Sequence, residues 1–441
     1  MNLSLRPIPM KTRTRLAALI SAASSVLVAA SATASDPGWT DLLNTPGQSH
    51  RAAVIDPFSN DPQAADLILA GDVHGVQSGL LHRFSQTGSS LTPLDLATAS
   101  FGTSGLTWDT GPSSAGVGAL YKLGTILRTA SNGNIVKQWT VHRGTDAATT
   151  WTGVDSYNLA DAWSEARGAA MDQAGNLYVC GMAIDAAGLS HWIVRRSTDQ
   201  GTHWTSTSVF QGSGGWSLTG YNVVEALGIT FVPTSGGSSG ALYAVGTRGK
   251  LYAGAWTVTR STDGGESWQV VDTDAWVPKK VGTSRARKVA ADSMGRVFVL
   301  GDTGSRMEND PSPWVIRMSS NGGGSWTTIF GPWNYGPCPY PIDLAVDTSG
   351  NVWAVGVTHE KYGTKRITYT SRATWVRLAE SAPGSGVWTS SYGFLTPEAP
   401  GLHQASADAI AADAAGRVYV SGSFKADDAS PWVWFTKRTS P

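Results

Sequence analysis

Short apolar runs recur along the chain, and in four places two of them are separated by the pattern Asp-x-x-Gly. These stretches read AAMDQAGNLYVCG, AADSMGRVFVLG, LAVDTSGNVWAVG and IAADAAGRVYVSG, and they begin at Ala169, Ala290, Leu344 and Ile410. Aspartate favours the first position of a type I turn, and glycine tolerates the left-handed conformation that closes a tight turn. The pattern therefore predicts β-hairpins, each with a largely apolar second strand.

Weaker copies of the same unit occur in three more places, so the hairpin is a repeat. DLILAGD, GALYKLG and GALYAVG match its second half, from Asp66, Gly118 and Gly240. A glycine closes the second strand of each copy, with 53 to 66 residues between consecutive ones: Gly71, Gly124, Gly181, Gly246, Gly301, Gly356 and Gly422. About 58 residues per unit is long for a propeller blade but fits one with variable loops.

A second motif follows the closing glycine after a variable loop. A tryptophan opens its strand in six units: Trp139, Trp192, Trp256, Trp314, Trp375 and Trp432. The best copies then read Ser-x-Asp-x-Gly-x-x-Trp, at 197–204 and 261–268, with a looser copy from Ser319. The Ser and Asp side chains can satisfy turn amides, the glycine accepts a positive φ, and the last tryptophan buries its ring beneath the turn. The motif predicts a second hairpin in each unit.

Two hairpins per unit make a four-stranded antiparallel sheet, and seven units predict an all-β, seven-bladed β-propeller. The last unit ends at WVWFTKRTSP without a fourth strand, whereas the segment around Trp39 resembles one. We therefore expect the N-terminal strand to close the last blade. Ring closure removes sheet edges that could pair with other chains.

The motif at 197–204 and 261–268 resembles the Asp-box, or bacterial neuraminidase repeat, of the sialidase-like β-propeller superfamily. Sialidases, xyloglucan-degrading glycosidases, sortilin-type receptors and a photosystem II assembly factor carry it, so the resemblance implies the propeller and no single activity. For a sialidase it would also imply an Arg-Ile-Pro stretch, an arginine triad, a tyrosine nucleophile with a glutamate partner and an aspartate acid/base. This chain has no Arg-x-Pro and no Tyr and Glu pair that matches, so this catalytic set is not carried over.

Residues 1–34 are expected to be a cleaved signal peptide, and residues 35–441 a single propeller domain. Arg6, Lys11, Arg13 and Arg15 precede the apolar run LAALISAASSVLVAA, which ends at the small residues of 32–34. No later apolar run approaches the roughly 20 residues of a membrane span. The sequence thus predicts a secreted or periplasmic protein without a membrane span.

Charge and motif content argue against several function classes. Without the four positive charges of the signal segment, 29 basic residues face 33 acidic ones, which gives no footprint for nucleic acid. The eight histidines lack metal-ligand spacing, and neither a calcium loop nor Gly-x-Ser-x-Gly occurs. We expect a monomer with no cofactor and no metal. A disulfide between Cys180 and Cys338 is chemically allowed in this compartment, but their positions in a strand and a distant linker argue against it.

The linkers between blades carry the first set of candidate ligand-binding residues. Four tryptophans outside the repeated positions lie in successive linkers: Trp163, Trp216, Trp276 and Trp333. Aromatic rings exposed around a rim could stack on sugars or anchor a protein partner. The alternative, which we favour from sequence alone, is that they fold back and cap the blades.

Charged residues that enter the first strands form the second set. They would surround the channel mouth on the linker face, where ligands usually approach a propeller. The candidates selected for ligand binding are Glu165, Arg167, Glu225, Arg287 and Asp343, while Arg51, Arg285 and Asp408 occupy similar places. The alternative is mutual ion pairing around a wet channel.

The sequence therefore favours an exported, non-catalytic propeller that binds a protein or carbohydrate ligand through the linker face. The rival hypothesis is a diverged sialidase-like exo-glycosidase. Carboxylates about 5 to 9 Å apart at the channel mouth, beside an arginine cluster, would favour this enzyme. A third alternative, a propeller with no small ligand, is favoured if the linker tryptophans are fully buried.

Overall fold

The computed structural model describes most of the chain after residue 37, and every regular element in the described part is a β-strand. The expected signal peptide at 1–34 lies outside the described residues. The described residues are 38–46, 48–55, 67–73, 76–84, 91–93, 102–108, 119–145, 150–212, 222–234, 240–250, 253–274, 283–305, 313–333, 339–362, 368–395, 404–427 and 430–439.

Within the described residues the strands form seven four-stranded antiparallel sheets, and six of these consist of four consecutive strands. The first three sheets contain β2 (Gln48–Ile55), β3 (Leu67–Val73), β4 (Val76–Phe84) and β5 (Leu91–Pro93); β6 (Gly102–Trp108), β7 (Leu120–Thr129), β8 (Ile135–Thr145) and β9 (Thr150–Tyr157); and β10 (Ser164–Met171), β11 (Leu177–Ile184), β12 (Ser190–Ser197) and β13 (Thr205–Gln211).

The next three sheets contain β14 (Asn222–Pro233), β15 (Gly240–Lys250), β16 (Ala253–Ser261) and β17 (Gln269–Asp274); β18 (Thr283–Ala291), β19 (Val297–Ser305), β20 (Trp314–Ser319) and β21 (Thr327–Trp333); and β22 (Tyr340–Val346), β23 (Val352–Tyr362), β24 (Thr368–Glu380) and β25 (Trp388–Phe394). The remaining sheet joins both ends of the described chain, with β26 (Gln404–Ala412), β27 (Val418–Lys425), β28 (Val433–Arg438) and β1 (Thr40–Pro46).

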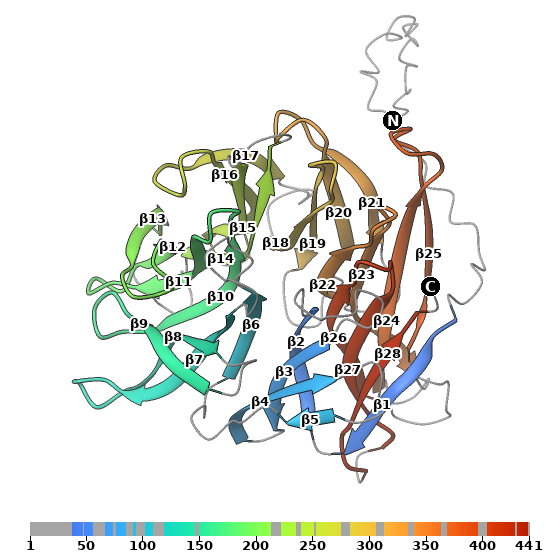
Figure 1. Cartoon of the computed structure of the whole chain (residues 1–441), viewed down its shortest axis with the longest axis horizontal. Helices are drawn as coiled ribbons and strands as arrows, with labels where there is room; N and C mark the ends of the chain where they lie inside the picture. Colours follow the sequence, from blue (N-terminus) through green and yellow to red (C-terminus); the bar gives the residue numbers. More distant parts are fainter. Residues whose placement is uncertain are drawn as a thin grey trace, which may run out of the picture.

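The sheets follow one another around a common centre, as Figure 1 shows. The first strand of each sheet contacts the first strand of the next, in the order β2, β6, β10, β14, β18, β22 and β26, and β26 contacts β2 again. This arrangement is an all-β propeller with four-stranded antiparallel blades, as the sequence predicts. The first strands of the blades therefore line the axis of the ring.

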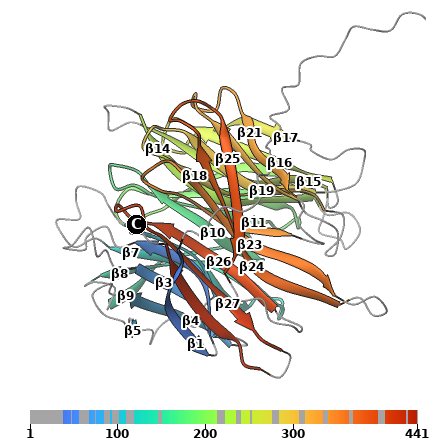
Figure 2. The same ribbon diagram turned by 90° about the vertical axis from the view of Figure 1, so that its right-hand side faces the viewer.

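The N-terminal strand completes the last blade, which confirms the prediction of ring closure. β1 pairs with β28 in antiparallel fashion from Thr40, opposite Arg438, to Pro46, opposite Val433. Figures 1 and 2 both show β1 beside the C-terminal strands. Trp39, just before β1, packs against Trp353 of the neighbouring blade with ring centroids 6.0 Å apart.

The Asp-x-x-Gly turns explain the regular letters of the first hairpin. The Asp172 carbonyl accepts the Gly175 amide at 3.1 Å, and its side chain accepts the amides of Ala174 and Asn176 at 3.0 and 2.9 Å. The second carboxylate oxygen accepts the Tyr178 hydroxyl at 3.0 Å. Two further blades place an aromatic donor on the turn aspartate in the same way: Trp353 on Asp347 and Tyr419 on Asp413.

The closing glycines and the strand-opening tryptophans meet between neighbouring blades. A Cβ on Gly181 would lie 1.9 Å from the Glu165 backbone oxygen and 2.6 Å from the Trp139 ring of the preceding blade. The same contact recurs in three more pairs: Trp192 with Gly246, Trp256 with Gly301 and Trp314 with Gly356. All four tryptophans are fully buried. The closing glycine of one blade and the strand-opening tryptophan of the preceding blade, the two most regular residues of the repeat, thus form one interblade contact.

Two of the six tryptophans predicted to open third strands occupy other positions. The defining position, held by Trp192 in β12, pairs with the residue that follows the closing glycine. In β24 this position holds Ala373, and Trp375 lies two residues later. In the last blade it holds Trp434, and Trp432 precedes β28. The prediction was wrong at these two sites because it took the tryptophan as the marker of the strand start, whereas pairing with the glycine strand fixes the register.

The Ser-x-Asp-x-Gly-x-x-Trp motif is a turn staple, as predicted. Ser261 Oγ donates to Asp263 Oδ1 at 2.7 Å and accepts the Gly265 amide at 2.9 Å. Asp263 also accepts the Ser267 amide at 3.0 Å, and Trp268 Nε1 donates to the Gly265 carbonyl at 3.1 Å. Gly265 has a φ of 89°, which a residue with a Cβ adopts rarely. The regular spacing in this motif therefore reflects folding and not chemistry.

The Asp263 carboxylate gives a prediction for acid conditions. Hydrogen bonds from the side chain and the amide of Ser267 lower the pKa of Asp263 to about 2. Because this pKa is lower than that of the unfolded chain, about 4, the ionised group stabilises the turn above pH 4, and that contribution is lost as the pH falls through 2. NMR titration of the carboxyl should give a midpoint near 2 that rises in Ser267→Ala. A midpoint near 4 in the parent protein would contradict the staple.

Candidate functional site

A β-bulge interrupts the first strand of every sheet at the same place. In each strand the ladder to the second strand skips one residue, and the skipped residues are Arg51, Ser104, Arg167, Leu227, Arg287, Ile342 and Asp408. A bulge leaves its extra residue unpaired and re-aims the side chain, and bulges are frequent beside active sites. Two of the charged residues selected from sequence, Arg167 and Arg287, therefore owe their orientation to a bulge.

The residues that follow the bulges bring the first strands close together. A Cβ on Gly168 would lie 3.1 Å from the Gly228 Cα, and one on Gly228 would lie 3.5 Å from the Lys288 Cα. Lys288 Nζ is 3.6 Å from Asp343 Oδ1, and Asp343 Oδ2 accepts the Ile410 amide at 3.0 Å. Contacts thus pass from strand to strand around part of the axis, directly next to the bulged residues.

Glu165, two residues before a bulge, is the centre of one charged group. Its side chain is 8% exposed and accepts hydrogen bonds from Trp163 Nε1 at 2.6 Å and Lys137 Nζ at 3.1 Å. Arg167 Nη2 lies 2.6 Å from the other carboxylate oxygen. Lys137 Nζ also lies 5.0 Å from the centroid of the Trp163 ring, within cation–π range. Three donors therefore hold this carboxylate in place.

Arg167 also links Glu165 to the neighbouring blade. The same Nη2 atom is 3.7 Å from Glu225 Oε2. Both carboxylates contact this one atom, at 2.6 and 3.7 Å. Their nearest oxygens therefore cannot be farther apart than these two distances added together. This limit allows the carboxyl separation of about 5 to 5.5 Å that retaining glycoside hydrolases use. We call Lys137, Trp163, Glu165, Arg167 and Glu225 the Glu165 cluster.

Arg287 is the centre of a second group in the next two blades. Its guanidinium donates to the fully buried Asp302 carboxylate and, at 2.5 Å, to the Tyr340 hydroxyl. It also lies 3.9 Å from the centroid of the Tyr340 ring. Burial alone would lower the pKa of Arg287, but Asp302 and Tyr340 raise it above its usual value. With Arg285, which lies 3.7 Å from Asp302, these residues form the Arg287 cluster.

The linker tryptophans behave in different ways. Trp163 belongs to the Glu165 cluster, whereas Trp333 packs on Trp314 and Tyr392 with centroids 5.4 and 5.2 Å apart. The linker placement predicted for Trp333 is wrong, because Trp333 ends β21 and pairs with Trp314. Its ring folds back onto the sheet, as the capping alternative states. Trp216 and Trp276 lie outside the described residues. Neither Trp163 nor Trp333 is fully buried.

The charged candidates all form ion pairs at the ring mouth, either with one another or with residues outside the candidate set. Glu165, Arg167 and Glu225 share one cluster, Arg287 is paired with Asp302, and Asp343 with Lys288. Mutual ion pairing, the alternative named from sequence, is therefore present. A role of these residues in ligand binding stays a prediction.

Sequence reasoning missed four residues of the site, namely Lys137, Lys288, Asp302 and Tyr340. Two of them carried a usable signal. Asp302 directly follows the closing glycine Gly301, and Tyr340 is paired one residue beyond the closing glycine of its blade, as Glu165 is. Lys137 lies on a different strand from the glutamate that it contacts, so only the folded structure brings them together.

Cys180 is a buried free thiol in β11. Burial raises the pKa of this thiol to about 12, although the nearby charges of Lys288 and Arg167 oppose the shift. The side chain is therefore a packing group and not a nucleophile at neutral pH. Cys338, its conceivable partner, lies outside the described residues.

The fold and the ring mouth define this protein as a β-propeller. No family model and no curated protein matches the sequence. Among solved structures, a protein of unknown function from Dyadobacter fermentans is 13% identical, with a TM-score of 0.43, over 92% of this chain and 100% of that one. An α-L-arabinanase of Penicillium chrysogenum complexed with arabinobiose is 15% identical, with a TM-score of 0.38, over 71% of this chain and 92% of that one. A puromycin-hydrolysing peptidase of Mycobacterium tuberculosis is 14% identical, with a TM-score of 0.41, over 85% of this chain and 50% of that one.

Two further properties concern membranes and metals. In the described part of the chain, no helix has the length and apolar character to cross a membrane. Within the same residues, no three His, Cys, Asp or Glu side chains gather closely enough to hold a metal ion.

Proposed function

We propose that this protein is an exported, monomeric propeller of the Asp-box type, with seven blades and no catalytic activity, that binds a carbohydrate at the mouth of its ring. The supporting observation is the bulge shared by the first strands, which places the Glu165 and Arg287 clusters beside the axis. Regular alternation along a strand would not aim these side chains in this way.

The pairing within the clusters supports binding over catalysis. Three donors engage the Glu165 carboxylate, so its oxygens are held in place by Lys137, Trp163 and Arg167. Asp302 is buried against Arg287, out of reach of a ligand in solution. Carboxylates held in this way can accept hydrogen bonds from sugar hydroxyls, and the cations can donate to them, without rearrangement.

Exposed aromatic surface supports a carbohydrate as the ligand. Tyr340 is 44% exposed, and Arg287 fixes its ring by a stacked contact and a hydrogen bond to its hydroxyl. The Trp163 ring is held by Glu165 and Lys137. Rings that are both exposed and immobilised offer a flat apolar face for a sugar at low entropic cost.

Binding can be tested on a glycan array, followed by calorimetry on the best ligand. We expect Tyr340→Ala and Arg167→Met each to weaken binding at least tenfold, about 1.4 kcal/mol. Tyr392→Ala is the matched control, because Tyr392 is 41% exposed but belongs to the outer strand β25. Full affinity of the Tyr340 and Arg167 variants, or no glycan bound by the parent protein, would refute the proposal.

A retaining exo-glycosidase of sialidase-like type is the second candidate function. The observation that favours it is the pair of Glu165 and Glu225, both within reach of Arg167 Nη2. Aryl glycosides, including sialosides, would then be hydrolysed by the parent protein and not by Glu225→Gln. Turnover that survives this substitution would point to a contaminating enzyme.

A further inference from the structure

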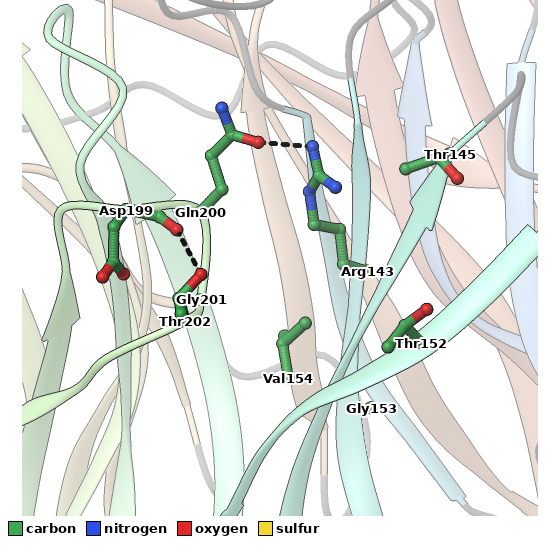
Figure 3. Close-up of a pocket in the computed structure, with 9 residues that line it drawn as sticks. All are labelled: Arg143, Thr145, Thr152, Gly153, Val154, Asp199, Gln200, Gly201 and Thr202. Carbon is green, nitrogen blue, oxygen red and sulfur yellow. Dashed lines mark hydrogen bonds between the residues drawn. The ribbon is translucent and has the colours of Figure 1, made fainter.

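A groove lies between the second and third blades, far along the sheets from the ring mouth. It has a volume of about 380 Å³ and is bounded by the β8–β9 hairpin and by the turn between β12 and β13 (Figure 3). The ring-mouth residues stand at the start of first strands, whereas this turn follows the end of a third strand. Since first and third strands run in the same direction, the groove and the mouth are at opposite ends of the blades.

The backbone of the groove has an unusual feature at Gln200. This residue has a φ of 60°, a conformation that residues with a Cβ rarely adopt. The equivalent position in the two following blades is a glycine, Gly264 with a φ of 74° and Gly322 with a φ of 69°. The repeat thus prefers glycine here, and only this turn carries a side chain among the three. Strain retained at one member of a repeat points to a role other than folding.

The side chain at Gln200 determines what the groove offers a ligand. Gln200 Oε1 accepts a hydrogen bond from Arg143 Nη2 at 2.5 Å, which fixes both side chains and leaves the amide nitrogen of Gln200 as a donor. Figure 3 shows these two side chains meeting across the groove, with Thr145 and Thr152 on the adjoining strands. Where glycine replaces glutamine, the corresponding arginine Arg196 lies directly against Gly264.

The acidic residue in the lining, Asp199, is engaged by donors other than Arg143. Asp199 accepts the His203 amide at 2.8 Å, His203 Nδ1 at 2.6 Å and Ser197 Oγ at 2.9 Å. Its carboxylate is directed away from Arg143 in Figure 3. The groove therefore presents a guanidinium, an amide donor and the hydroxyl groups of three threonines, Thr145, Thr152 and Thr202.

We propose that this groove is a second ligand site, specific for a small polyhydroxylated carboxylate of the sugar-acid type. Arg143 and the amide nitrogen of Gln200 bind the carboxylate, because both are donors that are held in place. Thr145 and Thr152 bind the hydroxyl groups of the ligand. The volume is at the lower end of the range of small-molecule sites, about 300 to 1,000 Å³, and suits a ligand of one or two rings.

Calorimetric titration with D-glucuronate, and with D-glucose as the uncharged analogue, tests this site. We expect saturable glucuronate binding in the micromolar to low millimolar range, about tenfold or more tighter than glucose. Gln200→Gly should weaken glucuronate binding at least tenfold while leaving the melting temperature unchanged or higher, because it restores the residue that the repeat uses elsewhere. Arg143→Met should also lose binding.

A control substitution tests whether glucuronate binds in this groove and not elsewhere on the protein. Arg260→Met alters the equivalent arginine beside Gly322 and should leave glucuronate binding intact. These expected results do not depend on whether the ring mouth binds a carbohydrate, so the two proposals can fail separately. Absence of glucuronate binding, or full affinity in Gln200→Gly, overturns the second site. A Gln200→Gly variant that melts lower and binds nothing would identify the Arg143 contact as an interblade clamp and would also overturn it.

Discussion

Gly301→Ala is expected to destabilise the protein by about 3 to 5 kcal/mol, more than a typical single substitution. The added Cβ would lie 1.9 Å from the Arg285 backbone oxygen and 2.4 Å from the ring of Trp256. The oxygen belongs to the paired first strand, and the ring is fully buried in the preceding blade. The oxygen cannot move without separating the two paired strands, and the ring cannot move without separating the two blades. The loss is measured as a shift of the thermal unfolding transition followed by circular dichroism.

Gly153→Ala is the matched control for this prediction. Gly153 also lies in a strand, β9, but the nearest atom to an added Cβ is His142 Nε2 at 3.5 Å, an ordinary contact. The free energy of unfolding of the Gly153→Ala variant should stay within about 0.5 kcal/mol of that of the parent protein. If both variants unfold at the parent temperature, the glycine is not required by the close approach of the blades.

The fold could be predicted because its signals are local and repeated. The aspartate and glycine of each first hairpin act within their own turn, as Asp172 and Gly175 do. The Ser261 staple likewise depends on contacts within a few residues. Such interactions require the same letters at the same spacing in every blade. They are therefore visible in one sequence without its structure.

The register of the third strands could not be predicted as well. Trp375 and Trp432 carry the expected residue type, but neither is paired with the residue that follows the closing glycine of its blade. Register is set by pairing with the second strand, and Ala373 fits the position beside the glycine strand without the usual tryptophan. Composition identifies such a strand, whereas its exact position depends on tertiary pairing.

The candidate site was predicted in part. Arg167 and Arg287 were found because charged residues that enter the first strands were expected to surround the channel mouth, and both are bulged residues. Their partners came from distant segments, as Lys137 does for Glu165. Gln200 gave no chemical signal, since its importance follows from a positive φ that a sequence does not show.

Asp155→Ala should destabilise the protein by about 3 to 5 kcal/mol, because it leaves a buried arginine without its counter-charge. Arg195 of the third blade donates two hydrogen bonds to Asp155 of the second, from Nε and Nη2, both at 2.8 Å. Both residues are buried, and the guanidinium also stacks on Tyr157 at 4.2 Å. Urea unfolding followed by tryptophan fluorescence measures the change.

The double variant Asp155→Leu/Arg195→Met separates the lost ion pair from lost packing. A buried pair replaced by apolar groups of similar size costs little, since both charges are relieved of burial together. We expect the double variant to recover most of the stability that the single substitution removes. Equal losses in the two variants would mean that Asp155 and Arg195 hold the blades together by their own attraction. The corresponding pair of the fourth and fifth blades, Asp272 and Arg317 at 3.0 Å, should respond in the same way.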